Sequence, residues 1–412
     1  MKRLFYGWKM VAAGAGIQFL QASLLLQSFG AYVAVLRDDR GWSKTELSFA
    51  AALHQMEAAI IGPALGWIID RFGTPLVVRT GVLLLGIGFM LLSGIDSLAA
   101  FYGAFIVIAL GSSMCGFMPL NISLIYWFEK KRARALSTLG FGLAVGGLAV
   151  PLVAWCIATW GWRATAFGSG VLILLAGLPL SFVIRGRPHF HGEFVDGEPL
   201  PDTPSRLQAQ RAADGTRDFT AREALRTPAF WLLSLGHGFA LFVVTAVNVH
   251  AITHLKEGLG YPVATAALFI MLMTIGQIGG IAIGALVGDR FDKRLICAVC
   301  MLMHMAGLLC LTYAANLAMI VGFAVLHGVA WGLRGPFMQA IRADYFGVSA
   351  IGMILGLSFM IIVVGQIGGP MIAGFMADLT GNYRAGFTTL ALLAGLGSMF
   401  FLFAKKPPRP AA

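Results

Sequence analysis

Twelve stretches of about 20 predominantly apolar residues run through this chain of 412 residues. A stretch of this length forms a helix that crosses the roughly 30 Å hydrocarbon layer of a membrane. Only 12% of the residues are charged and 58% are hydrophobic, whereas about 25% are charged in a typical soluble protein. The sequence therefore predicts an all-α membrane protein. The twelve predicted transmembrane helices lie near residues 8–35, 45–69, 76–95, 98–125, 135–158, 164–184, 229–255, 263–288, 295–314, 317–341, 350–376 and 385–404.

The basic residues indicate the orientation of these helices. If the N-terminus is inside the cell, only six of the 30 Lys and Arg residues fall outside, and Arg334 lies within a span. Such a bias places both termini in the cytoplasm. The net charge of +11 then reflects membrane topology, so no nucleic-acid partner is needed to explain it. The short loops favour the plasma membrane of a bacterium, its inner membrane.

A polar stretch at residues 185–228 divides the spans six and six. It has seven arginines against seven acidic residues, with several Pro and Gly. This composition predicts a cytoplasmic linker with a short helix near "TAREALR". We therefore expect an N-terminal six-helix half (1–184), a C-terminal six-helix half (229–404) and a cytoplasmic tail (405–412).

The two halves repeat one another in sequence. "LRDDRGW" at 36–42 matches "LKEGLGY" at 255–261, and "GWIIDRFG" at 66–73 matches "ALVGDRFD" at 285–292. Both pairs are offset by 219 residues, as are the prolines at 151 and 370. A single offset at several landmarks indicates duplication, and parallel six-span repeats predict two pseudo-symmetric halves.

The motif after the second span is Asp70-Arg71-Phe72-Gly73, and its second copy is Gly288-Asp289-Arg290-Phe291. It resembles the loop signature of the major facilitator superfamily, and the resemblance covers nearly the whole chain. It implies the major facilitator fold, a monomer, and a cytoplasmic gate built on Asp70, Arg71, Asp289 and Arg290. In such a gate the carboxylate lies at a helix N-terminus and bonds to an arginine. Ordinary cytoplasmic charge remains the alternative.

Three further pieces are similar to the monocarboxylate and oxalate/formate branch of that superfamily. They are "YGW" at 6–8, "GWSKTELS" at 41–48 and "YWFEKKRARALSTLGFGLAVGG" at 126–147. The glycines of the third piece, Gly142, Gly146 and Gly147, should let span 5 pack closely on a neighbour. The branch carries an arginine in span 8, and the exchangers carry a lysine in span 11. Both residues are absent here, which argues against a classical lactate porter.

Arg334 in span 10 is the candidate for binding an anionic substrate. Its planar guanidinium matches a carboxylate, and Gly332, Gly335 and Pro336 surround it. The corresponding place in span 4 has Gly116, Pro119 and Asn121. Spans interrupted by Gly and Pro at matching positions indicate a transport site. Alternatively, Arg334 extends to the cytoplasm or pairs with Asp344 or Glu57.

Glu57 and His54 are an acid and a base one turn apart in span 2. An acid and a histidine together in a membrane cavity can relay protons, so we predict that they couple transport to a proton. A structural ion pair between Glu57 and Arg334 is the alternative.

Amide side chains within the spans could surround a solute. Gln277 and Gln366 lie in identical "GQIGG" sequences in spans 8 and 11, and hydrogen bonds between helices are their alternative role. The histidines at 304 and 327 look like isolated packing residues. The predicted substrate-binding amides are Gln27, Asn121, Asn248, Gln277 and Gln366.

The sequence contains no Walker-type phosphate loop, so ATP is not expected to drive transport. No metal or cofactor is predicted, and no catalytic group for an enzyme stands out. The prediction is a secondary transporter that moves a small organic anion by alternating access with a proton in symport. Monocarboxylates are favoured and aromatic acids remain open. The alternative is a proton-antiport exporter of drugs or metabolites.

Overall fold

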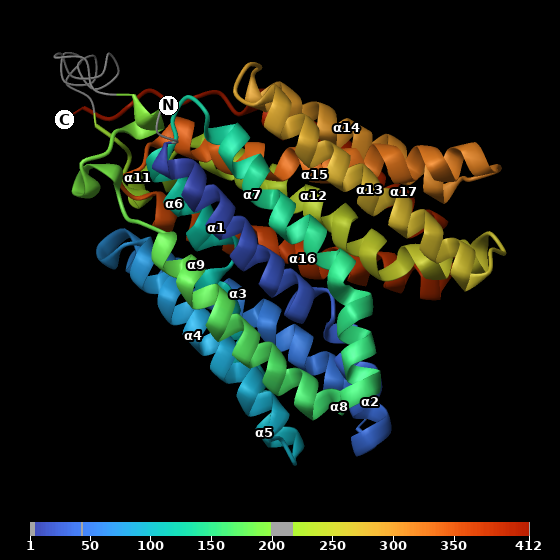
Figure 1. Cartoon of the computed structure of the whole chain (residues 1–412). Coiled ribbons are helices and arrows are strands. Elements are labelled where there is room, and N and C mark those ends of the chain that lie inside the picture. Colours follow the sequence, from blue (N-terminus) through green and yellow to red (C-terminus); the bar gives the residue numbers. More distant parts are fainter. Residues whose placement is uncertain (1–4, 43, 199–216, 412) are drawn as a thin grey trace. The chain divides into compact units, whose positions relative to one another are not determined.

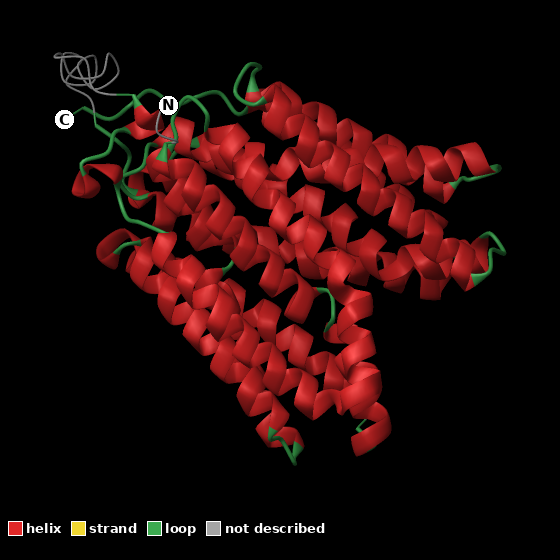
Figure 2. Ribbon diagram, in the orientation of Figure 1, coloured by secondary structure: helices red, strands yellow, loops and turns green. Residues whose placement is uncertain are grey.

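A computed structural model describes residues 5–42, 44–198 and 217–411 of the chain. Throughout these residues the secondary structure is helical, without a β-strand (Figure 2). The helices are labelled in Figure 1. The chain divides into two compact units: unit 1 is formed by residues 1–130 and 138–209, and unit 2 by residues 131–137 and 210–412.

Unit 1 contains the helices of the first six predicted spans. In chain order they are α1 (Tyr6–Gln21), η1 (Ala22–Leu26), α2 (Phe29–Arg40), α3 (Lys44–Phe72), α4 (Thr74–Ser93), α5 (Leu98–Cys115), α6 (Phe117–Trp127), α7 (Arg132–Gly146), η2 (Gly147–Ala149), α8 (Val150–Leu172), η3 (Ile173–Gly177) and α9 (Leu178–Val183). The first turns of α7, up to Ser137, belong to unit 2.

The second set of six spans lies in unit 2, which also contains one short linker helix. Its helices are α11 (Ala221–Leu225), α12 (Pro228–Thr253), η6 (His254–Gly258), α13 (Val263–Val287), α14 (Lys293–Thr312), α15 (Leu317–Phe346), α16 (Ile351–Thr380) and α17 (Arg384–Phe403). Helix α11 lies in the predicted "TAREALR" segment, where Thr220 and Glu223 form a capping box.

The earlier part of the linker belongs to unit 1 and forms two single turns, η4 (Pro188–His191) and η5 (Val195–Gly197). The Asp196 carboxylate accepts hydrogen bonds from the backbone amides of Glu129 and Lys130, at 3.2 and 2.8 Å. This part of the linker therefore fixes the loop that precedes α7.

Among the described residues, ten helical stretches are long and apolar enough to cross a membrane. One of them, residues 132–183, contains both predicted spans 5 and 6, separated at Gly161 by a φ of +79°. A left-handed backbone angle of this kind favours glycine. With this stretch counted as two spans, and with the 29-residue helix α3, the structure accommodates the twelve predicted helices. The predicted all-α membrane fold is confirmed.

Glycines let the helices of each unit approach backbone to backbone. In unit 1, a Cβ on Gly142 would overlap the carbonyl of Ala15, and one on Gly146 would meet Ala22. The predicted close packing of span 5 is confirmed at these two positions. Gly147, by contrast, has only the Gln27 side chain near it, at 3.7 Å.

The "GQIGG" sequences of unit 2 serve the same purpose. A Cβ on Gly280 of α13 would overlap the Val329 carbonyl of α15, and one on Gly369 of α16 would overlap the Phe242 carbonyl of α12. Small residues four apart on a helix face allow this approach. The repeated motif is therefore a helix-packing motif in both places.

Two of the six spans in unit 1 are broken in the middle. Gly116 interrupts span 4 between α5 and α6 with φ −88° and ψ −147°. The first span contains the π-helix η1, after which Gln27 and Ser28 form a turn. The Ser28 hydroxyl donates to the Ser23 carbonyl at 2.5 Å, which satisfies one backbone group freed by this break.

The predicted interruption of span 10 is wrong, because α15 continues through Pro336. Proline removes one backbone hydrogen bond and normally bends a helix. Here Gly332 and Pro336 are buried, and the Gly332 backbone packs directly on the Gln277 carbonyl of α13. Packing along this face holds the helix together.

Candidate substrate and proton sites

Glu57 lies on α3 and is half-buried within unit 1. One of its carboxylate oxygens, Oε2, accepts a hydrogen bond of 2.8 Å from the Ser113 hydroxyl of α5. The other oxygen, Oε1, is buried and has no hydrogen-bond partner in the described residues. This carboxyl group has one fixed oxygen and one open oxygen, which is an arrangement that can take up a proton. The side chain of His54 lies outside the described part of the structure.

Buried amide groups line the inner side of α1. The Gln21 side chain donates to the Ser112 carbonyl at 2.9 Å and to the Ser112 hydroxyl, which ties α1 to α5 just before the Gly116 break. Gln18 is only 1% exposed, and neither its amide nitrogen nor its oxygen has a partner among the described residues. A buried unsatisfied amide requires an explanation, such as a solute or water at that place.

The predicted amides of unit 1 differ from this pair. Asn121 is buried on α6, where its side-chain nitrogen donates to the Phe117 carbonyl at 2.7 Å. This nitrogen therefore bonds within its own helix, to the carbonyl four residues earlier. Gln27 is exposed in the turn after η1.

Two fully buried arginines lie two turns apart on α15 in unit 2. Arg334 and Arg342 are each 1% exposed, and neither is within ion-pair distance of a carboxylate in the described part of the unit. A buried charge without a counter-ion is costly. Asp344, an alternative partner of Arg334, instead pairs with Arg132 and Lys293.

The two arginines have different bonds. Arg342 donates to the Met338 carbonyl at 2.7 Å and to the Leu233 carbonyl of α12 at 3.1 Å, so its guanidinium joins α15 to α12. Arg334 has a single polar contact, from Nη1 to the Met338 sulfur at 3.0 Å, and its Nε has no partner among the described groups. Because a thioether is a weak acceptor, Arg334 keeps most of its donor capacity.

Sequence reasoning missed a histidine pair. His304 of α14 and His327 of α15 are both fully buried, and their Nδ1 atoms are 3.2 Å apart. One ring must donate and the other accept, so the bond holds only one proton. The two histidines are 23 residues apart on different helices, and no local pattern in the sequence could have paired them.

The predicted amides of unit 2 lie at different depths. The Gln277 backbone contacts Gly328 and Gly332 of α15. Gln366 is half-buried and its side-chain oxygen has no partner among the described residues, whereas Asn248 is exposed. Of these three predicted amides, Gln366 resembles Gln18 in having a buried amide atom without a partner among the described residues.

The second copy of the Asp-Arg motif forms a charged cluster. Both Asp289 oxygens accept from the Ala133 backbone amide at the start of α7, at 3.2 and 3.0 Å. Lys293 bonds to Asp289 and to Asp344, both at 2.9 Å, and Arg132 pairs with Asp344.

The neighbouring charges of this motif are more exposed. Arg290 is exposed next to the cluster. The Arg294 guanidinium keeps the pKa of the Asp292 carboxyl below its usual value. Asp289 thus lies at the N-terminus of α7, as the resemblance implied, but its ionic partner is Lys293 and not an arginine.

The first copy of the motif has a different local structure. Asp70 and Arg71 lie in the last turn of α3, which ends before Gly73 with φ +84°. The Asp70 carboxylate accepts from the Tyr126 hydroxyl at 3.5 Å. The Arg71 guanidinium lies over the Trp67 ring, 5.3 Å from its centroid.

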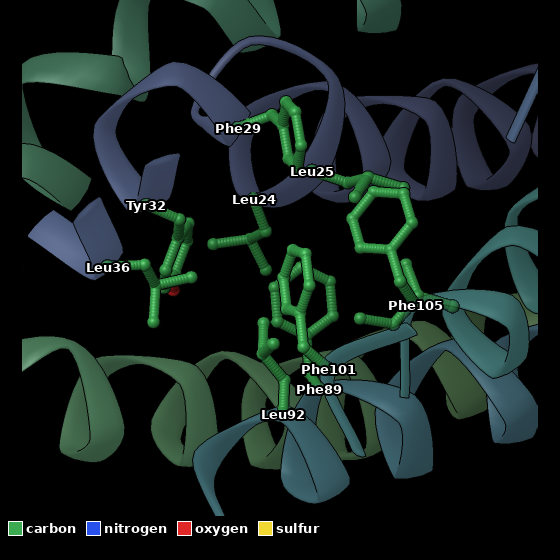
Figure 3. A pocket seen from close by; sticks show the side chains of 10 residues that line it. Leu24, Leu25, Phe29, Tyr32, Leu36, Phe89, Leu92, Phe101 and Phe105 are labelled. Carbon is green, nitrogen blue, oxygen red and sulfur yellow. The ribbon is translucent and has the colours of Figure 1, made fainter. Parts of the chain in front are cut away.

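A small apolar cavity lies beside the break in the first span. Aromatic and aliphatic side chains from η1, α2, α4 and α5 surround it, among them Phe29, Tyr32 and Phe105 (Figure 3). Its free space of about 10 Å³ is the size of a single water molecule, and its walls are apolar. It is therefore too small for a substrate.

Comparisons with known proteins agree with this architecture. The family model described as Major Facilitator Superfamily matches residues 11–315 and 233–412. Monocarboxylate transporter 13 of Bos taurus is 25% identical, over 98% of this chain and 92% of the relative. Monocarboxylate transporter 11 of Homo sapiens is 27% identical, over 96% of this chain and 82% of the relative.

A solved structure shows the same fold. The proton:xylose symporter XylE, bound to 6-bromo-6-deoxy-D-glucose, aligns with a TM-score of 0.76 over 97% of this chain and 96% of that chain, at 16% identity. Two six-span units, the duplicated Asp-Arg motif and the match of the family model lead to one conclusion. The chain is a transporter that belongs to the Major Facilitator Superfamily.

Proposed function

We propose that this transporter moves a small organic anion, with monocarboxylates as the favoured class, and that a proton accompanies the anion in symport. The observation that carries the proposal is the pair of fully buried arginines in unit 2 without a carboxylate partner among the described residues. A buried cation without an internal partner fits an anion supplied by the substrate. The similarity to monocarboxylate transporters supports the same class of substrate.

Arg334 is the group that would bind the carboxylate. Both terminal nitrogens of Arg342 donate to backbone carbonyls and only its Nε is without a partner among the described residues, whereas Arg334 has only the Met338 sulfur to give up. A carboxylate would replace this weak acceptor with two charge-assisted hydrogen bonds. In this proposal Gln366 and Gln277 flank the substrate from unit 2, and Asn248, Asn121 and Gln27 remain as polar positions along its path.

Glu57 is the proposed proton carrier, with His54 as its neighbour one turn away. Support comes from the bond between Ser113 and Oε2 and from the open oxygen Oε1. A carboxyl group that alternates between charged and neutral forms can link proton movement to the anion. The Asp-Arg motifs, with Asp70 and Arg71 in unit 1 and Asp289 and Arg290 in unit 2, would act as the cytoplasmic gate.

The test is uptake of labelled carboxylates into proteoliposomes, with and without an inward proton gradient. Wild type should accumulate a monocarboxylate only with the gradient. Arg334→Gln should weaken binding about 30-fold or more, because truncating one partner of a buried charge pair costs about 2–5 kcal/mol. Arg334→Lys keeps the positive charge but loses the planar guanidinium that binds a carboxylate through two hydrogen bonds, so it should recover only part of the affinity.

Two further variants complete the test. Glu57→Gln should still bind the anion and exchange it, but it should lose the accumulation driven by the gradient. Arg222→Gln, a change at an exposed linker arginine, is the matched control and should behave as wild type. If no carboxylate is transported, or if Arg334→Gln transports normally, the substrate class is wrong. If Glu57→Gln keeps gradient-driven accumulation, Glu57 is not the coupling group, and His304 and His327 are the next residues to change.

A further inference from the structure

A second, polar cavity lies entirely within unit 2, at the ends of its helices opposite the Asp289 motif. It is formed by η6, the end of α16 and the start of α17, and its volume is about 570 Å³. The lining residues with charged or polar side chains are His254, Glu257, Asp378, Asn382, Tyr383 and Arg384. None of them belongs to the proposed substrate site, so a ligand in this cavity is independent of the proposed function.

His254, one of the lining residues, has a buried ring nitrogen without a hydrogen-bond partner among the described residues. The side chain is 2% exposed, and its Nε2 lies 3.1 Å from the Leu311 carbonyl of α14. A carbonyl oxygen can only accept, so Nε2 must carry the hydrogen and Nδ1 is left with a lone pair. Nδ1 has no partner among the described residues.

The local backbone leaves space beside this buried lone pair. Residues His254–Gly258 form the π-helix η6, an irregularity that often marks functional sites. Gly258 also lines the cavity, and a Cβ at this position would stand 2.9 Å from His254 Nδ1. Any residue other than glycine would therefore crowd the one open acceptor of the ring.

The neighbouring groups are also mainly acceptors. His250 has its Nε2 3.0 Å from the Pro370 carbonyl, so its Nδ1 must accept the hydrogen of the Tyr383 hydroxyl at 3.2 Å. The Tyr383 oxygen then offers only lone pairs. Burial, together with the carboxylates of Glu257 and Asp378, raises the pKa of Tyr383, so the hydroxyl stays protonated.

The charges of the cavity favour a cation. Glu257 and Asp378 are exposed, and neither forms an ion pair within the described part of the chain. Arg384 is the single cation in the lining, which leaves a net charge of −1 with His254 neutral. Among the described residues, no three His, Cys, Asp or Glu side chains are placed to hold a metal ion, so these groups do not form a metal site. An organic ligand that fits two carboxylates, one ring nitrogen and one phenol oxygen would bring N–H donors and positive charge.

We propose that this cavity binds a small organic compound through a primary ammonium group. The ammonium donates to His254 Nδ1 and to the carboxylates of Glu257 and Asp378. A carboxylate elsewhere on the ligand would meet Arg384, so amino acids fall within the proposed class. The chemistry requires N–H donors, and this requirement separates an ammonium from a quaternary amine of the same charge.

The experiment measures binding to the purified full chain by isothermal titration calorimetry at pH 7. The probes are n-butylamine, tetramethylammonium and n-butanol. Butylamine should bind, whereas tetramethylammonium should bind at least several-fold more weakly and butanol should not bind. Glu257→Gln and Asp378→Asn should each weaken butylamine binding about two- to fivefold, as expected for partly exposed charge pairs.

Two further variants test the open nitrogen. His254→Gln keeps a donor towards Leu311 but removes the Nδ1 lone pair, and Gly258→Ala covers this lone pair without altering the ring. Both should weaken butylamine binding. Glu223→Gln, which removes a carboxylate of the same unit outside the cavity, is the matched control and should leave binding unchanged.

The proposal is overturned if butylamine does not bind. It is also overturned if butanol or tetramethylammonium binds as tightly as butylamine, or if the variants at Glu257 and Asp378 bind like wild type. Because the carboxylate uptake assay is separate, either proposal can fail alone.

Discussion

The packing role assigned to the "GQIGG" sequence of α13 can be tested with two adjacent glycines. A Cβ on Gly280 would overlap the Val329 carbonyl of α15, whereas a Cβ on Gly279 would meet no atom within 4 Å. Both positions lie in the interior of the same helix. Glycine to alanine changes at the two positions therefore gain the same helix propensity, about 0.5–1 kcal/mol, and differ only in packing.

The expected difference follows from the cost of overpacking. Gly279→Ala should be neutral or slightly stabilising. Gly280→Ala must push α13 and α15 apart, at a cost of about 1–3 kcal/mol. For a cooperative unit of about 200 residues this corresponds to a melting temperature about 2–12 °C below that of Gly279→Ala.

The assay is thermal unfolding of both variants and wild type in the same detergent at the same scan rate, because unfolding of such proteins is often irreversible. If Gly280→Ala melts within a degree of Gly279→Ala, the two backbones do not approach as closely as described. In this case the glycines of the motif would need another explanation.

Two other predictions concern charged groups. Asp344→Asn removes the carboxylate that pairs with both Arg132 and Lys293 and should cost about 1–3 kcal/mol in thermal unfolding. Asp292→Asn keeps a good N-cap and should cost less than about 1 kcal/mol, so equal losses for the two variants would contradict the charged cluster. The bonds from Arg217 and Thr220 lower the pKa of the Glu223 carboxyl from 4.5 to about 2. The contribution of Glu223 to the capping box is therefore present above pH 4.5 and lost as the pH falls towards 2. Amide hydrogen exchange of α11, corrected for the intrinsic exchange rate, should accelerate only over that pH range.

The fold was largely predictable from the sequence for a physical reason. Spanning a membrane demands long apolar helices, so composition alone constrains the secondary structure. The offset of 219 residues then relates the halves, and the packing glycines at Gly142 and Gly146 could be recognised because only glycine permits such contact. The broken helix at Gly116 is also visible as a Gly and Pro signal, but the same signal at Pro336 gives a continuous helix.

The candidate site was less predictable because it depends on the rotation of each helix about its axis. Arg334 stood out as a charge within a span, but the sequence did not show that Arg342 is equally buried or that its two terminal nitrogens donate to backbone carbonyls. His304 and His327 looked like isolated residues until the packing of α14 on α15 placed them in contact. Such contacts between side chains of different helices depend on the tertiary structure, and the periodicity of the sequence does not predict them.

The polar residues of the spans differ between the two halves. At the offset of 219 residues, Arg334 corresponds to Cys115 and Glu57 corresponds to Gly276. The buried arginines thus lie in unit 2 and the half-buried carboxyl group lies in unit 1, together with the two broken helices. If anion and proton are bound by residues of different units, neither unit alone can couple them. Coupling in this proposal is therefore a property of the full chain, and an isolated unit 2 that bound a carboxylate would be expected to do so without responding to the proton gradient.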